Sequence, residues 1–192
     1  KRFESGVRFN MNMLYEDRIP LNNITKYTFF KKDSIRITPN FPAERVKAAE
    51  IFPHQAFIVS FNISFRPGQR YIQLPNSKIS LGSKYPTFTF GYSKGVKNIF
   101  GSDVDFDRWK LAINDDKNFK LAGSLKYRLG VGGFLNNKKV NIQDYQHFNG
   151  NEAVTASEYV NSFQLVKYYA YSTTEQFYGI AHLEHHFNGL LT

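Results

Sequence analysis

Residues 118–131 alternate between apolar and polar side chains over an unusual length. The apolar positions are taken by Phe119, Leu121, Leu125, Tyr127 and Leu129, and Lys, Arg, Ser and Ala lie between them. A strand of a water-soluble protein usually has about 5 or 6 residues, whereas a transmembrane β-strand needs about 9 to 11 tilted ones. The segment is therefore predicted to form a two-faced strand that is long enough to span a bilayer.

Six further segments are predicted as spanning strands, and the alternation is clearest in those of the first two thirds of the chain. They are residues 3–16, 55–66, 85–94, 105–114, 162–171 and 177–188. Together the seven segments predict an all-β fold, an antiparallel up-and-down transmembrane β-barrel, with residues 1–192 as a single barrel segment. An odd number of strands does not close a standard bacterial barrel. We therefore expect an incomplete barrel, with further strands outside this chain.

The connections between these segments alternate between short and long. Short polar turns are predicted at residues 115–117 and 172–176, and long loops near residues 17–54 and 132–161. This asymmetry is typical of outer-membrane barrels, which have short turns on one side and long loops on the other. The exception is the connection 67–84, which is either a small hairpin outside the membrane or a sign that the strand count is wrong by two.

Composition narrows the class of protein. Aromatic residues make up 17% of the chain, yet its mean hydropathy is negative. No run of eighteen apolar residues occurs, which excludes a transmembrane helix. The net charge of +9 is spread over many segments, without the basic and aromatic clusters of nucleic-acid binders, so no nucleic-acid partner is predicted. Outer-membrane lipid is the expected partner, and no cofactor is predicted.

Polar side chains between the apolar positions are predicted to face a barrel lumen. The candidates are Arg8, Asn10, Asn12, Arg108, Lys110, Lys120, Lys126 and Arg128. Most of them are basic, which favours anions inside the lumen. An alternative is that basic residues contact anionic lipid headgroups at the barrel rim.

A histidine-rich segment offers the main candidate for chemistry. His182, Glu184 and His186 share one face of a predicted strand, and two His with one carboxylate can bind a divalent transition metal. Residues two apart on a strand lie nearly 7 Å from each other, which is wide for three ligands on one ion. The alternative is a polar ladder along the lumen, and no metal site is assigned.

The long loop 132–161 contains a polar and aromatic group at Tyr145, His147 and Asn149. Functional residues are frequent in such loops, so these side chains are candidates for a constriction inside the lumen or for a partner contact. They could equally be an Asn-Gly turn packed under aromatic rings. The usual hydrolase and nucleotide-binding motifs are missing, so an enzyme is not predicted.

Three segments resemble one known family: residues 66–71, 145–151 and 177–192, of which Glu184-His-His-Phe-Asn-Gly189 is the most specific. They are similar to the barrel portion of a Bacteroidetes outer-membrane family of unknown function. Its members carry a carboxypeptidase-regulatory-like domain ahead of the barrel. The resemblance implies an outer-membrane location and a barrel fold, and it implies no peptidase activity.

Three classes of function remain open from the sequence. The first is an integral outer-membrane barrel with a non-enzymatic role in envelope transport or biogenesis, with envelope proteins as partners or as a subunit of a larger complex. It predicts lipid contacts for Phe9, Phe61, Phe90, Leu111, Leu125 and Leu183. The second is a soluble β-barrel or sandwich that binds a ligand. The third is a metal-dependent enzyme that uses His182, Glu184 and His186.

Overall fold

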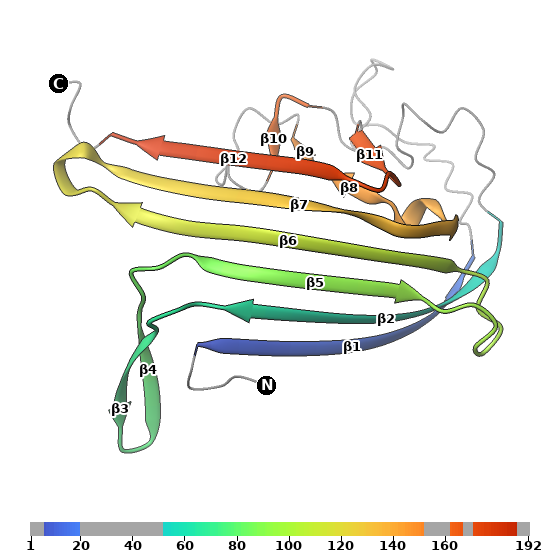
Figure 1. The fold of residues 1–192 in the computed structure, drawn as a ribbon, viewed down its shortest axis with the longest axis horizontal. Coiled ribbons are helices and arrows are strands. Elements are labelled where there is room, and N and C mark those ends of the chain that lie inside the picture. The colour runs from blue at the N-terminus through green and yellow to red at the C-terminus, as the bar shows by residue number, and fades with distance from the viewer. Residues whose placement is uncertain (1–5, 20–51, 152–161, 167–170, 188–192) are drawn as a thin grey trace, which may run out of the picture.

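The chain folds around one long antiparallel sheet (Figure 1). The computed structural model describes residues 6–19, 52–151, 162–166 and 171–187. The sheet order is β1-β2-β5-β6-β7-β12, so each long strand pairs with the next long strand along the chain. Their bounds are β1 Val7–Arg18, β2 His54–Phe65, β5 Thr87–Gly95, β6 Asp105–Asn118, β7 Ser124–Lys139 and β12 Tyr178–His186. The all-β, antiparallel class predicted from the sequence is confirmed.

Short elements surround this sheet. They are the strands β3 Arg70–Leu74, β4 Ser77–Gly82, β8 Gln146–Phe148, β9 Gly150–Asn151, β10 Phe163–Gln164 and β11 Tyr171–Thr173, and the 3-10 helices η1 Lys120–Ala122 and η2 Ile142–Asp144. The strands β3 and β4 form a separate hairpin that projects from the end of β2 (Figure 1), which confirms a hairpin within residues 67–84, while its position outside a membrane stays a prediction. The strands β8 and β11 pair antiparallel, and β9 and β10 pair in parallel. No helix among the described residues is long and apolar enough to cross a membrane.

The described strands do not close into a barrel. The long strands β1 and β12 are the two edges of the sheet within the described residues. The predicted strand 162–171 is wrong as a spanning strand, because β10 has only two residues there and β11 begins at Tyr171. Residues 167–170 between them, and most of the predicted loop 17–54, lie outside the described residues.

The turn predicted at residues 115–117 is also wrong. The strand β6 continues to Asn118, and β7 begins only at Ser124. The turn in between is closed by the Phe119 amide, which donates to the Gly123 carbonyl at 2.7 Å. Gly123 is required there, because its φ is +97° and an added Cβ would lie 1.8 Å from the His186 carbonyl oxygen.

The strand β7 also extends eight residues into the loop predicted at 132–161, ending at Lys139. Gly132 and Gly133 made these residues look like a loop in the sequence. A Cβ at Gly133 would lie 1.8 Å from the Gln176 carbonyl oxygen, and one at Gly132 would lie 2.6 Å from the Trp109 carbonyl oxygen. These glycines therefore let other backbone segments approach the strand closely.

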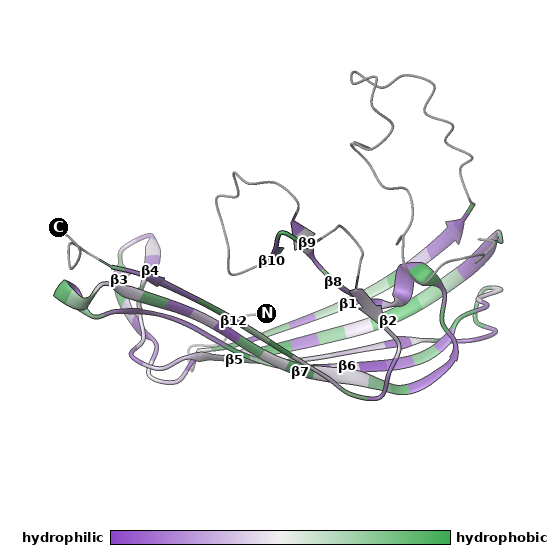
Figure 2. Cartoon of the chain, turned by 90° about the horizontal axis from the view of Figure 1, so that it is seen from above, coloured by the Kyte–Doolittle hydropathy of each residue, from purple (hydrophilic) through white to green (hydrophobic). Residues whose placement is uncertain are grey.

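The strand registers sort the side chains into two faces, because residues opposite each other in an antiparallel pair share a face. We call them the apolar face and the polar face, and Figure 2 shows the alternation along the strands. The apolar face carries Val7, Phe9, Met11, Met13, Tyr15, Phe57, Val59, Phe61, Ile63, Phe65, Phe88, Phe90, Tyr92, Trp109, Leu111, Ile113, Leu125, Tyr127, Leu129, Val131 and Leu183.

The small hydrophobic core lies on the polar-face side, at one end of the sheet. It consists of Ala56, Ile58, Val104, Phe106 and Phe134. The rings of Phe106 and Phe134 meet edge to face with centroids 6.2 Å apart. Gly95 makes room for this cluster, since an added Cβ would lie 2.6 Å from the Phe106 ring.

Candidate functional site

The polar face contains most of the candidate residues from the sequence. Arg8, Asn10 and Asn12 lie there on β1, Arg108 and Lys110 on β6, and Lys126 and Arg128 on β7. Lys120 lies in η1, outside the sheet, so the strand alternation that assigned it to this face does not apply. In Figure 2, β8, β9 and β10 lie over the same side of the sheet.

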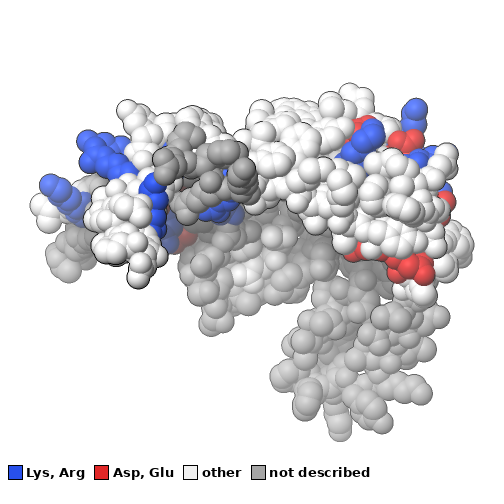
Figure 3. Space-filling view, turned by 90° about the horizontal axis from the view of Figure 1, so that it is seen from below, with Lys and Arg blue, Asp and Glu red and all other residues white. Residues whose placement is uncertain are grey.

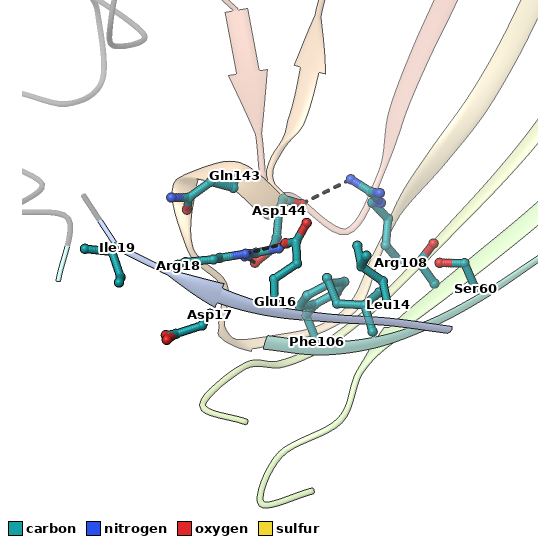
Figure 4. Close-up of a pocket in the computed structure, with 12 residues that line it drawn as sticks. Leu14, Glu16, Asp17, Arg18, Ile19, Ser60, Phe106, Arg108, Gln143 and Asp144 are labelled. Atoms are coloured by element: carbon teal, nitrogen blue, oxygen red, sulfur yellow. Dashed lines mark hydrogen bonds and ion pairs between the residues drawn. The ribbon is translucent and has the colours of Figure 1, made fainter. Parts of the chain in front are cut away.

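The polar face ends in a pocket of about 750 Å³ near the last residues of β1 (Figure 4). Its walls come from the end of β1, the middle of β2, the end of β5, the start of β6 and the helix η2. The lining residues are Leu14, Glu16, Asp17, Arg18, Ile19, Ile58, Ser60, Ser93, Phe106, Arg108, Gln143 and Asp144. The pocket therefore has an apolar floor on the core and a charged wall on η2.

The charged wall is built around Arg18 and Asp144. The two terminal nitrogens of Arg18 donate to the two carboxylate oxygens of Asp144, at 2.8 and 2.9 Å, and its Nε donates to Glu16 at 2.7 Å. The Asp144 side chain is 3% exposed and that of Arg18 is 11% exposed. Such a bidentate pair fixes both position and orientation, so Arg18 fastens η2 to the edge strand β1.

A second arginine fastens the same segment to the middle of the sheet. Arg108 on β6 donates through one terminal nitrogen to the carbonyl oxygens of Asp144 and Tyr145, at 3.1 and 3.3 Å. Figure 4 shows Arg18 and Arg108 approaching Asp144 from opposite sides. We call the group Arg18, Arg108 and Asp144 the latch, because it holds residues 142–145 against the polar face.

The loop candidates lie next to the latch. His147 contacts the Ile142 carbonyl through Nε2 at 2.8 Å and Ser172 Oγ through Nδ1 at 3.0 Å, and its ring stacks on that of Tyr145. Asn149 accepts a backbone bond from Phe163 at 2.8 Å. Asn149 joins β8 to β9, and the Phe148 ring meets those of Phe163 and Tyr178 edge to face, so a constriction, a partner contact and a packed Asn-Gly turn all stay predictions.

The three metal candidates share the polar face of β12. His182 packs on the Phe163 ring with centroids 4.5 Å apart, and Glu184 and His186 contact each other. Their cross-strand neighbours are Arg128, Lys126 and Ser124, in the same order. No group of three or more His, Cys, Asp or Glu within the described residues is arranged to hold a metal ion.

Charged groups occur at both ends of the apolar face. At one end Asp107 accepts from Lys94 at 2.8 Å and from the Tyr92 hydroxyl. At the other end the buried Asp115 pairs with Lys117 at 2.7 Å and with Arg66 at 3.4 Å. Figure 3 shows charged side chains gathered toward the two ends of the molecule, with a largely uncharged surface between them.

Comparison with known proteins identifies a family. Residues 1–192 match the model of the C-terminal domain of DUF5686, a family of unknown function. The chain belongs to this family. No curated protein matches it, and no solved structure does.

The latch of this DUF5686 domain contains residues that the sequence did not single out. Arg18 and Asp144 are 126 positions apart, and neither belongs to a recognisable motif. The acidic residue inside a loop rich in Gly and Asn was the only available signal. Long-range pairing of this kind depends on the sheet register, which brings the end of β1 close to η2.

Proposed function

We propose that this domain is part of an integral outer-membrane β-barrel with a non-enzymatic role in envelope transport or biogenesis. The observation that carries the proposal is the apolar face, which has exposed side chains on each of the six long strands from the edge strand β1 to the edge strand β12. Met13 is 61% exposed, Leu111 47% and Leu183 70%. Monomeric soluble proteins rarely expose contiguous apolar surfaces of this kind, which mark partner or membrane contacts.

The distance between the charged ends of the apolar face supports a membrane in particular. On β6 the charged residues Asp107 and Asp115 are eight positions apart and enclose Trp109, Leu111 and Ile113 on that face. At about 3.4 Å per residue they are separated by roughly 27 Å along the strand. With the strand tilt of membrane barrels the height is about 21 Å, close to the apolar band of about 25 Å of outer-membrane proteins.

The proposal requires further strands beside β1 and β12. An open sheet edge leaves backbone groups without partners, and lipid does not supply any. Bacterial outer-membrane barrels have at least about eight strands. We therefore propose that the six-stranded sheet is completed by additional strands, and that the polar face lines the interior with the latched loops inside it.

The resemblance to a Bacteroidetes outer-membrane family supports the same location, and a role within a larger envelope complex is part of the proposal. The pocket of about 750 Å³ favours a second candidate, a water-soluble β-protein that binds a small ligand at the latch. In that case another protein surface would have to cover the apolar face.

Fractionation of cells that express the intact protein separates the two candidates. We expect the protein in the outer-membrane fraction, resistant to alkaline carbonate and extracted only by detergent. A monodisperse protein in detergent-free buffer would contradict the barrel and support the soluble ligand binder. The variants Leu111→Arg and Ala112→Arg form a matched pair for this test. Neighbouring residues on β6 lie on opposite faces, so only Leu111→Arg places a charge on the apolar face.

A further inference from the structure

The centre of the polar face has a charge distribution of its own. Within the described residues, four successive cross-strand rows, from that of Arg108 to that of Arg128, contain four basic residues and no Asp or Glu. Their described members are Asn12, Ser60, Ser93, Arg108, Phe134; Asn10, Asn62, Gly91, Lys110, Gly132, Tyr178; Arg8, Ser64, Thr89, Ala112, Gly130, Ile180; and Thr87, Asn114, Arg128, His182. We call these rows the basic belt.

The carboxylates that the described residues place on or over the polar face lie outside the basic belt. Toward the pocket they are Glu16 on β1 and Asp144 on η2, and both are engaged by Arg18. Toward the η1 turn they are Asp116 and Glu184, in the row of Lys126. Among the described residues, Arg108 and Lys110 therefore lie in rows without a carboxylate, between two ends in which charges are compensated.

Lys110 lies in the middle of the basic belt, and its side chain lies flat against the sheet. Its cross-strand neighbours are Gly91 and Gly132, which have no side chains. A Cβ at Gly91 would lie 2.5 Å from Lys110 Cε and 2.6 Å from Asn62 Oδ1. The Lys110 stem therefore crosses Gly91 toward Asn62, and within the described residues its ammonium has neither a hydrogen bond nor an ion pair.

Arg108 adds a second cation beside Lys110. Within the described part of the chain it forms no ion pair, and it uses one terminal nitrogen for the two carbonyl oxygens of the latch. The remaining guanidinium donors are available to a ligand, and Arg binds planar or tetrahedral oxyanions well. The hydroxyls of Ser60 and Ser93 share its row and offer further donors.

We propose that the basic belt binds a small soluble anion of the phosphate class at Lys110 and Arg108. In anion and phosphate channels, rings of Lys and Arg side chains make the pore selective for anions. This inference rests on the proposed function, because a barrel places the polar face toward an aqueous interior. It adds to that function the chemical class of the solute.

Calorimetric titration of inorganic pyrophosphate into the intact purified protein, in a nonionic detergent at low ionic strength, tests the belt. Lys110→Glu is expected to weaken binding by about tenfold or more, because it replaces an attractive charge with a repulsive one. Lys110→Gln is expected to weaken it less. The control Lys138→Glu changes the net charge equally, at an exposed position near the end of β7 outside the belt, and is expected to bind as the parent protein does.

Absence of pyrophosphate binding by the parent protein would overturn the inference, and so would equal losses in Lys110→Glu and Lys138→Glu. If Lys110→Glu does not fold, Lys110→Gln decides, because it removes the charge and keeps a polar side chain of similar length. Fractionation gives an independent result. If the protein fractionates with the outer membrane but does not bind pyrophosphate, only the proposed anion site is refuted. If it is soluble and binds pyrophosphate through Lys110, only the proposed membrane barrel is refuted.

Discussion

The two faces of the long sheet share one backbone and differ in which side has packing partners. The apolar face is exposed, and its rings contact mainly one another. The centroid of the Phe61 ring lies 5.7 Å from that of Phe90 and 5.4 Å from that of Tyr92. The polar face supports the small core, the latch and the strands β8 to β11. In a water-soluble domain the apolar side would be the covered one. The reversed arrangement supports the proposal that a partner other than water covers the apolar side of this sheet.

The packing on the polar face also uses different forces. Residues 142–145 are held there by charge-assisted hydrogen bonds from Arg18 and Arg108, while the loop rings of Phe148 and Phe163 pack on Tyr178 and His182. Such bonds are stronger than neutral ones and directional. They fix the position of η2 without requiring an apolar patch on a face that we propose to be wet.

A charge placed on each face in turn gives the largest expected effect. Leu111→Arg should lower the free energy of unfolding in lipid vesicles by about 2 to 4 kcal/mol, the cost of a basic residue near the bilayer midplane. Ala112→Arg, one position further, places the charge at a half-buried position on the polar face, one row from the charged Lys110, and should cost about 1 kcal/mol or less. Urea unfolding in vesicles, followed by tryptophan fluorescence of Trp109, measures both.

Equal costs for the two substitutions would remove the distinction between the faces. A negligible cost for Leu111→Arg would show that the apolar face lies in water, where an exposed Leu can be replaced freely. A large cost for Ala112→Arg alone would place the lipid on the side of the basic belt.

Removal of the latch should have a smaller and local effect. Arg18→Ala leaves the buried Asp144 carboxylate without its bidentate partner, at a cost of about 2 kcal/mol. The pocket lets water replace part of the lost interaction, which keeps the cost moderate. Hydrogen exchange of residues 142–148 should become faster, while exchange in the long strands should stay unchanged.

Lys94→Ala is the matched control for the latch. It also removes one ion pair, the one between Lys94 and Asp107, but the Lys94 side chain is 47% exposed. Exposed pairs contribute about 0.2 to 1 kcal/mol, so this variant should leave the exchange of residues 142–148 at the parent rate. Equal exchange in Arg18→Ala and in the parent protein would mean that the latch does not hold η2.

Local patterns in the sequence were sufficient for the two faces and insufficient for the latch. Side chains alternate along every strand, so the six residues predicted to contact lipid, such as Phe9 and Leu111, all lie on the apolar face. The polar candidates, apart from Lys120, share the other face for the same reason. The solvent on each side is not encoded by alternation, and it stays a prediction.

The errors in the predicted strands have physical causes of two kinds. Phe119 and Leu121 continue the apolar-polar alternation, although they lie in the turn between β6 and β7. Gly123 closes this turn, and it can reverse the chain whatever its neighbours are. Gly132 and Gly133 resemble loop residues, although they are strand positions that other backbone segments approach closely. The Arg18–Asp144 contact depends on the register of the whole sheet, and nothing local predicts it.

The smallest expected effect concerns an ion pair that lies beyond both faces, at the ends of strands. Lys139 donates to Asp103 at 2.9 Å, and this hydrogen bond lowers the pKa of the Asp103 carboxyl below its usual value. A lowered pKa adds stability above the pKa of the unfolded chain, and that stability is lost as the pH falls through the pKa of the folded protein. Lys139→Gln should therefore return the pKa of Asp103 to the usual range, which a carboxyl NMR titration measures.

Raised salt should have the same effect on the parent protein, since both side chains are nearly half exposed and exposed charges are screened. The Arg18–Asp144 pair is buried, so hydrogen exchange at η2 should stay unchanged at that salt concentration. If salt weakened both ion pairs, raising the pKa of Asp103 and also speeding exchange at η2, burial would not explain why the polar face holds its loops.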